Sequence, residues 1–213
     1  MDNKNLRSIP LNKQFLSPKV DDLLYGILLK ESNFHNGNRY ISMINYNKLR
    51  PFIKDTLELS QKAYQGHFSK MLELDLIQHI ESFTPESYVF PAFKPGDIYQ
   101  LIPIKVMDKI IANRIPHGIK LYALLLNKFL YFKDQYNFSF IQLAQELGWA
   151  KTNKDAAKVV HESMDTLREI GVVNWEEQIW IDPANNMPLK KHRLTFVENP
   201  HEAYSLEGML NFT

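Results

Sequence analysis

Three short apolar segments occur twice in this chain, in the same order and at nearly the same separation. Ile-Pro-Leu at residues 9–11 returns as Ile-Pro-Ile at 102–104, and Leu-Tyr-Gly-Ile-Leu-Leu at 24–29 returns as Leu-Tyr-Ala-Leu-Leu-Leu at 121–126. Met-Leu-Glu-Leu-Asp-Leu-Ile at 71–77 returns as Leu-Arg-Glu-Ile-Gly-Val-Val at 167–173, so the separations are 93, 97 and 96 residues. A nearly constant separation indicates an internal repeat. The 213 residues are therefore predicted to form two similar units.

The predicted boundary between the units is a segment that breaks helices and strands. Pro91, Pro95 and Gly96 lie within six residues of one another, and both residue types interrupt regular structure. We expect a first domain over residues 1–92, a second over 97–198 and a C-terminal tail over 199–213. The boundary segment is too short for a free linker, so the two domains are expected to touch.

Each unit is predicted to begin with an apolar helix. In the second unit the helix follows residues 116–118, and its apolar residues have helical spacing. In the first unit Ser17 and Pro18 are expected to open the helix, because proline is tolerated in a first turn. The shared Leu-Tyr-x-x-Leu-Leu pattern places Tyr25 and Tyr122 at equivalent, buried positions.

A short strand and a second helix are expected next. In the first unit residues 40–44 resemble a strand after the turn at 36–37, and a helix follows over about 46–57. Pro51 lies inside that helix, so it is expected to be kinked or to start late. In the second unit the corresponding helix covers residues 140–147 and is closed by Gly148.

A third helix and a two-stranded hairpin complete each unit. Ser60 is the expected N-cap of the third helix in the first unit, and residues 152–155 have capping-box-like spacing in the second. The hairpin strands are predicted at 76–80 and 88–90 in the first unit, and at 172–175, 179–181 and 189–197 in the second. Trp175 and Trp180 are interpreted as packing residues of the second hairpin, and the alternatives are a dimer contact or packing of one unit on the other. This order predicts a mainly α fold with small β-hairpins (α+β), made of two winged helix-turn-helix domains in tandem.

Composition narrows the class of protein. Cysteine is absent, which excludes disulfides and thiolate metal sites. The seven histidines have no metal-ligand spacing on one helix, and the chain has no Gly-Lys-Ser/Thr phosphate loop. We therefore expect no metal, no cofactor and no enzymatic activity. The polar N-terminus and the short apolar runs indicate a cytoplasmic protein without a membrane partner. A net charge of +1 argues against coating nucleic acid by bulk charge, but it permits a basic cluster on one face.

The third helix of the first unit carries the first set of candidate DNA-binding residues. Its polar residues lie off the apolar stripe of Tyr64, Phe68 and Met71, and side chains of these types suit base edges and phosphates. The alternative interpretation is an ordinary solvated helix face. The candidates are Ser60, Gln61, Lys62, Gln65, Ser69 and Lys70.

The second unit offers a helix set and a hairpin set. The helix candidates share their polar surface with the acidic residues Asp155, Glu162 and Asp165. The hairpin set is the densest basic cluster, with Lys191 and Arg193 on the side opposite Leu194 and Phe196. Its alternative role is protection of an exposed strand edge by charge. The candidates are Lys151, Lys154, Lys158 and His161 on the helix, and Lys190, Lys191 and Arg193 on the hairpin.

Parts of the chain resemble known DNA-binding families. Residues 102–104 with 119–126 are similar to the start of the winged-helix domain in replication initiators of Gram-positive plasmids and mobile elements. Residues 138–148 and 163–173 look like the core of bacterial winged-helix regulators, and the two-domain layout resembles iteron-binding plasmid initiators. The chain departs from that pattern by an insertion near residues 127–137 and by Pro51.

The resemblance implies sequence-specific binding of double-stranded DNA in replication initiation of a plasmid or mobile element. A homodimer and host replication proteins are further candidate partners. One alternative is a transcriptional regulator that binds a promoter as a dimer. Another is a protein-interaction adaptor that uses the same winged-helix fold to dock partners.

Overall fold

The computed structural model describes residues 6–10, 20–35, 38–83, 85–91, 99–133, 136–150, 153–182, 184 and 186–197. Within these residues the fold is mixed α and β with small antiparallel sheets, which confirms the predicted α+β class. We use "N-terminal unit" for residues 6–91 and "C-terminal unit" for residues 99–197. No helix of the described residues is long and apolar enough to cross a membrane.

The two units have similar, but not identical, orders of elements. After β1 (Leu6–Pro10), the N-terminal unit contains α2 (Asp22–Lys30), β2 (Asn33–His35), β3 (Asn38–Ser42), α3 (Met43–Thr56), α4 (Gln61–Glu73), β4 (Gln78–Ile80) and β5 (Ser87–Phe90). The C-terminal unit contains β6 (Tyr99–Pro103), α5 (Ile104–Ala112), α6 (Gly118–Tyr131), β7 (Asn137–Phe138), α7 (Phe140–Glu146), α8 (Lys154–Glu169), β8 (Val173–Ile181) and β9 (Pro188–Phe196).

The sheets of the two units have related strand orders. The N-terminal sheet has the order β2-β3-β5-β4, and the C-terminal sheet has the order β7-β9-β8. In both, the last strand of the hairpin lies between its own partner and a short strand, which is β3 before α3 in one unit and β7 before α7 in the other. The predicted succession of helix, short strand, two helices and hairpin is thus present twice.

Helix starts differ from the sequence predictions in the first residues. Asp21 caps α2 by accepting a hydrogen bond from Leu24 N, so that helix begins at Asp22 rather than at the predicted Ser17 and Pro18, which lie outside the described residues. Asn153 caps α8 by accepting from Ala156 N, which places the cap one residue after the predicted Thr152. Short side-chain acceptors at N-caps satisfy amides that have no partner within the helix.

The strand predicted at residues 40–44 is too long at its C-terminal end. Ser42 ends β3 and caps α3, and its Oγ accepts from Asn45 N at 3.3 Å. Met43 and Ile44 therefore lie in the helix. The helix also starts before the predicted residue 46 and continues past Pro51, so the late start expected from this proline is wrong.

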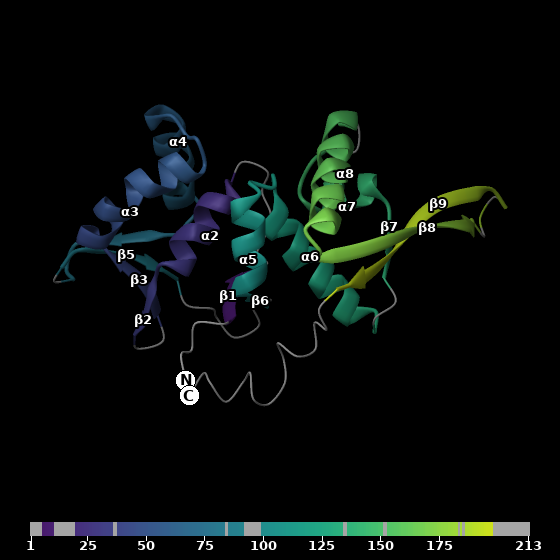
Figure 1. The fold of residues 1–213 in the computed structure, drawn as a ribbon. Helices are drawn as coiled ribbons and strands as arrows, with labels where there is room; N and C mark the ends of the chain where they lie inside the picture. Colours follow the sequence, from purple (N-terminus) through teal and green to yellow (C-terminus); the bar gives the residue numbers. More distant parts are fainter. Residues whose placement is uncertain are drawn as a thin grey trace.

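Neither the ribbon of β1 with β6 nor the helix α5 was among the predictions. β1 pairs with β6 as an antiparallel ribbon, and α5 follows β6 directly. Figure 1 shows this ribbon together with α2, α5 and α6 between the two sheets, while α4 and α8 rise on the same side of the molecule.

The two units share one hydrophobic core. Buried residues of α2, α5 and α6 belong to a single cluster that also reaches α4 and α8. Tyr25 and Tyr122 are 2% and 4% exposed, which confirms their predicted burial. Gly26 lies at a close contact of α2 with α6, because a Cβ at this position would overlap the tip of the Ile119 side chain and displace it. The expected contact between the two halves is therefore present.

A buried carboxylate joins the units at the start of α6. No side chain within α6 caps this helix, and the residue before it, His117, has a left-handed φ of 56°. Asp22 of α2 takes the capping role, since its Oδ2 accepts from Ile119 N at 2.8 Å and from Lys120 N at 3.1 Å. Lys120 is fully buried beside it and donates to Val20 O at 2.6 Å.

Candidate nucleic-acid interface

The α4 helix presents a polar face opposite its buried stripe. Tyr64, Phe68 and Met71 point into the core and are at most 7% exposed. Ser60 caps the helix as predicted, because its Oγ accepts from Ala63 N at 3.1 Å. Among the remaining candidates of this helix, Lys70 is partly buried. The exposed ones are Gln61, Lys62, Gln65 and Ser69.

Two of these candidates are engaged within the protein. Lys70 forms an ion pair with Glu73 at 2.6 Å, and Gln61 accepts a hydrogen bond from Lys54 at 3.0 Å. Within the described part of the chain, neither Lys62 nor Gln65 forms a side-chain hydrogen bond or an ion pair. These two side chains are therefore available to a ligand in front of the helix.

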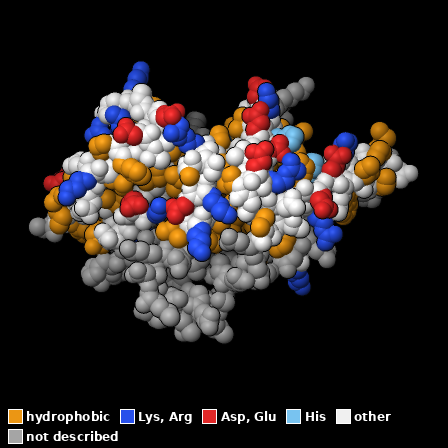
Figure 2. Space-filling model, in the orientation of Figure 1, with side chains coloured by type: hydrophobic (Ala, Val, Ile, Leu, Met, Phe, Trp, Pro, Cys, Tyr) orange, Lys and Arg blue, Asp and Glu red, His pale blue; other side chains and the backbone are white. Residues whose placement is uncertain are grey.

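The neighbouring helix adds positive charge. Across α3 and α4 there are five lysine or arginine residues and two acidic ones. Figure 2 shows blue side chains around this part of the surface. Phosphates are attracted to such an excess of lysine and arginine. This surface of the N-terminal unit is thus the more basic of the two third-helix surfaces.

A pocket of about 300 Å³ opens between α3 and α4, and its residues were not predicted from the sequence. Arg50 stands 5.6 Å from the centre of the Tyr64 ring, and Tyr64 donates a hydrogen bond to the Tyr46 hydroxyl at 3.0 Å. Polar groups of Asn47 and Gln65 also line the pocket, and none of the described residues that line it is acidic. The pocket therefore offers hydrogen-bond donors and a cation next to the polar face of α4.

The α8 helix has a different electrostatic character. It carries four acidic residues and three basic ones, and Figure 2 shows red side chains along it. Lys158 lies 3.9 Å from Glu162, and His161 lies 3.4 Å from Asp165. Two of the acidic residues on this polar surface, Glu162 and Asp165, thus lie beside predicted DNA-binding candidates. Lys151 lies outside the described residues, and nothing is described of the Lys154 side chain.

The basic cluster of the second hairpin is also partly neutralised. Lys190 forms an ion pair with Glu177 at 3.0 Å, and Arg193 lies directly opposite Glu176 on β8. Lys191 lies 5.2 Å from the ring of Trp180. Alternation places Lys191 and Arg193 away from the buried Leu194, as predicted. The acidic neighbours of Lys190 and Arg193 could not be predicted from the sequence, because they depend on the register of β8 on β9.

The tryptophans of this hairpin have separate environments. Trp175 packs against Phe140 and His192 with Arg168 4.3 Å above its ring, in agreement with a packing role. Burial lowers the pKa of His192 within this aromatic cluster. Trp180 is 44% exposed near the tip of the hairpin, so the packing role predicted for it is wrong. It lies beyond the part of the hairpin that covers the core.

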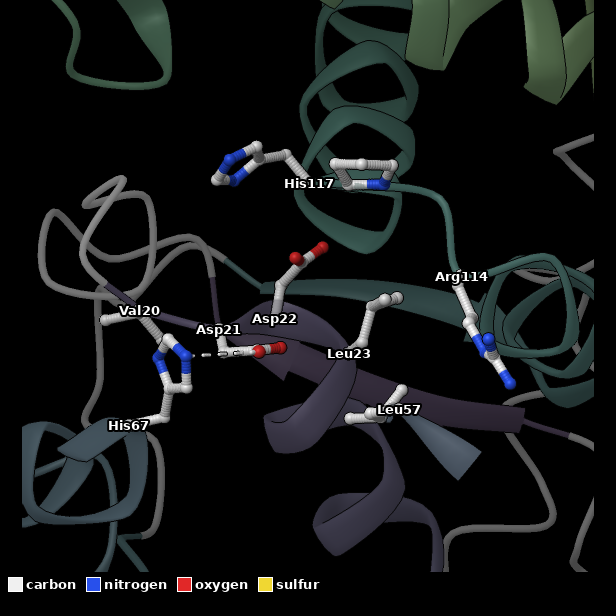
Figure 3. A pocket seen from close by; sticks show the side chains of 9 residues that line it. Val20, Asp21, Asp22, Leu23, Leu57, His67, Arg114 and His117 are labelled. Atoms are coloured by element: carbon white, nitrogen blue, oxygen red, sulfur yellow. Dashed lines mark ion pairs between the residues drawn. The ribbon is translucent and has the colours of Figure 1, made fainter. Parts of the chain in front are cut away.

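A second pocket, of about 330 Å³, lies where the two units meet. Figure 3 shows Asp21 and His67 facing each other, with Nε2 and Oδ2 3.9 Å apart, and His117 on the other side of Asp22. Burial, followed by the charge of Lys120, lowers the pKa of His117 to about 4, so its imidazole is neutral near pH 7. The contact of His67 with Asp21 thus joins α4 to the cap of α2.

In the described part of the chain, no cluster of three or more histidine and acidic side chains is placed to hold a metal ion. Comparisons with protein-family models, with curated proteins and with solved structures found no significant match.

Proposed function

We propose that this protein binds double-stranded DNA through two winged helix-turn-helix units, and that α4 is the principal recognition helix. The observation that carries the proposal is the polar face of α4, where Lys62 and Gln65 are exposed beside a basic α3. In a winged helix-turn-helix the third helix enters the major groove, where glutamine and lysine side chains suit base edges. The repeated order of elements in both units supports this assignment.

The charge distribution supports unequal roles for the units. Five basic and two acidic residues on α3 and α4 favour phosphate contacts by the N-terminal unit. The C-terminal unit has more acidic than basic residues on α8, and Glu177 pairs with Lys190 on its hairpin. We therefore assign most of the affinity to the N-terminal unit and a smaller share to α8 and the second hairpin.

Selection of bound duplexes from a random DNA pool tests the proposal and supplies the target sequence. With that target, Lys62→Ala and Gln65→Ala together should weaken binding about 5- to 150-fold, since one good base contact contributes roughly 1–3 kcal/mol. Lys105→Ala removes an equal charge from an exposed position on α5 and serves as the control. Equal affinity of the double variant and the control would remove α4 from the interface.

Within DNA-binding proteins, we propose a role in replication initiation, on the resemblance of residues 102–104 and 119–126 to plasmid initiators. Footprinting on the element that encodes the protein discriminates between roles. An initiator should protect repeated sites beside an AT-rich stretch. Protection of one promoter, together with normal replication after deletion, would instead establish a transcriptional regulator. Failure to bind any duplex at low salt would favour the protein-interaction adaptor.

A further inference from the structure

We propose that one copy of this chain recognises two half-sites in inverted orientation at a fixed separation, because its two units are related by an approximate two-fold axis. This inference rests on the proposed DNA binding and specifies the class of target. It is carried by contacts between positions that the sequence repeat makes equivalent.

The β1–β6 ribbon supplies the first observation. The repeat that relates residues 9–11 to 102–104 has an offset of 93 and makes Ser8 equivalent to Leu101. In the ribbon these two residues are paired with each other, and they form the central pair of the antiparallel ladder. The same offset makes Leu6 equivalent to Tyr99 and Pro10 equivalent to Pro103. The pair of Leu6 with Pro103 therefore corresponds to the pair of Tyr99 with Pro10, and both pairs are present. The ribbon is therefore mapped onto itself by the repeat.

The contact between α2 and α6 supplies a second, independent observation. Here the repeat has an offset of 97, which makes Asp22 equivalent to Ile119. Ile119 N donates to Asp22 Oδ2 at 2.8 Å, so these equivalent positions also touch each other. Contact of a residue with its own counterpart characterises an isologous, two-fold interface, whereas head-to-tail stacking of repeats joins different surfaces.

The third helices follow from this symmetry. α4 and α8 occupy equivalent places in the order of elements, and Figure 1 shows them on the same side of the molecule, flanking the shared α2, α5 and α6. A two-fold axis between them reverses the direction in which the second helix reads the duplex. Dimeric helix-turn-helix proteins match operator palindromes for this reason, with half-sites about 10–10.5 base pairs or a multiple apart.

The joint between the units is rigid enough to fix the separation. Lys30 of α2 binds Asp108 of α5 at 2.6 Å, and Arg114 Nε donates to Thr56 O at 2.7 Å. Asp22 is buried between the units, and they share one hydrophobic cluster. Because α4 and α8 differ in sequence, the two half-sites are expected to differ as well, with the α4 half-site contributing more affinity.

The test uses the intact chain and duplexes built from the selected target. The half-site that requires Lys62 and Gln65 is kept, and the second half-site is presented inverted, in direct orientation, or inverted with five added base pairs. The inverted duplex at the native separation should bind at least about tenfold more tightly than the other two, because each loses the contacts of one half-site. Five base pairs turn the second half-site to the opposite face of the duplex.

Stoichiometry completes the test, since two separate copies could also read an inverted site. Sedimentation of the complex should give one chain per duplex. Two chains per duplex, equal affinity for the direct arrangement, or indifference to five added base pairs would each overturn the inference while leaving DNA binding in place. Absence of duplex binding by the wild-type chain would refute the proposed function itself.

Discussion

Replacing Asp22 by asparagine should change how the stability of the protein depends on pH. Burial, partly offset by Lys120 and by the two backbone N–H groups, raises the pKa of the Asp22 carboxyl from 3.8 to about 6. The folded state therefore binds this proton more tightly than the unfolded state, and the group's contribution to the free energy of unfolding decreases as pH rises from 3.8 to 6. At 1.36 kcal/mol per pKa unit the full change is about 3 kcal/mol, of which about 2 kcal/mol falls between pH 4.5 and 7.5.

Urea unfolding of both proteins at several pH values measures this difference directly. Asparagine cannot titrate, so Asp22→Asn should gain about 2 kcal/mol relative to wild type between pH 4.5 and 7.5. Taking the difference at each pH cancels the groups that both proteins share, and Asp55→Asn controls for loss of a negative charge at an exposed position of α3. A difference between wild type and Asp22→Asn that stays constant over this range would refute the reasoning from burial.

Three further predictions concern side chains of α3 and α8. Arg50→Gln should weaken binding of all duplexes and lower the slope of log affinity against log salt by about 0.9, while Lys105→Gln, which removes an exposed charge on α5 outside the proposed interface, should leave the slope unchanged; equal slopes for the two variants would count against a phosphate contact in the pocket. Tyr46→Phe removes the buried hydrogen bond from Tyr64 and should cost about 1 kcal/mol in urea unfolding, and an unchanged midpoint would show that this bond adds nothing. Lys158→Ala breaks only an exposed ion pair with Glu162 and should alter stability by less than about 1 kcal/mol, so a larger loss in thermal unfolding would reveal a contact beyond that pair.

Sequence reasoning succeeded where side-chain patterns report directly on structure. Buried positions such as Tyr25, Tyr64 and Tyr122 follow from apolar spacing, and the cap at Ser60 follows from the chemistry of one residue. The β1–β6 ribbon could not be predicted in this way. It is held by backbone hydrogen bonds between segments about 93 residues apart, and such pairing leaves no signature in side-chain type.

The candidate site shows the same division between local and distant contacts. The ion pair of Lys158 with Glu162 has a spacing of four and was readable from the sequence. The pairing of Lys190 with Glu177 required the register of β8 on β9, and the pocket beside Arg50 required the packing of α3 on α4. Charge clusters read from sequence therefore overstated the basic character of the second hairpin, while the pocket was missed.

The shared core also determines how this protein unfolds. Because α2 is buried against α5 and α6, opening of either unit exposes apolar surface of the other unit to water. Opening also separates Asp22 from α6, so the first amides of that helix lose their hydrogen-bond acceptor. Local opening at this joint thus costs nearly as much as global unfolding. Amides of α2 and α6 should consequently exchange their hydrogens at a common slow rate, and the chain should behave as one cooperative folding unit despite its repeated sequence.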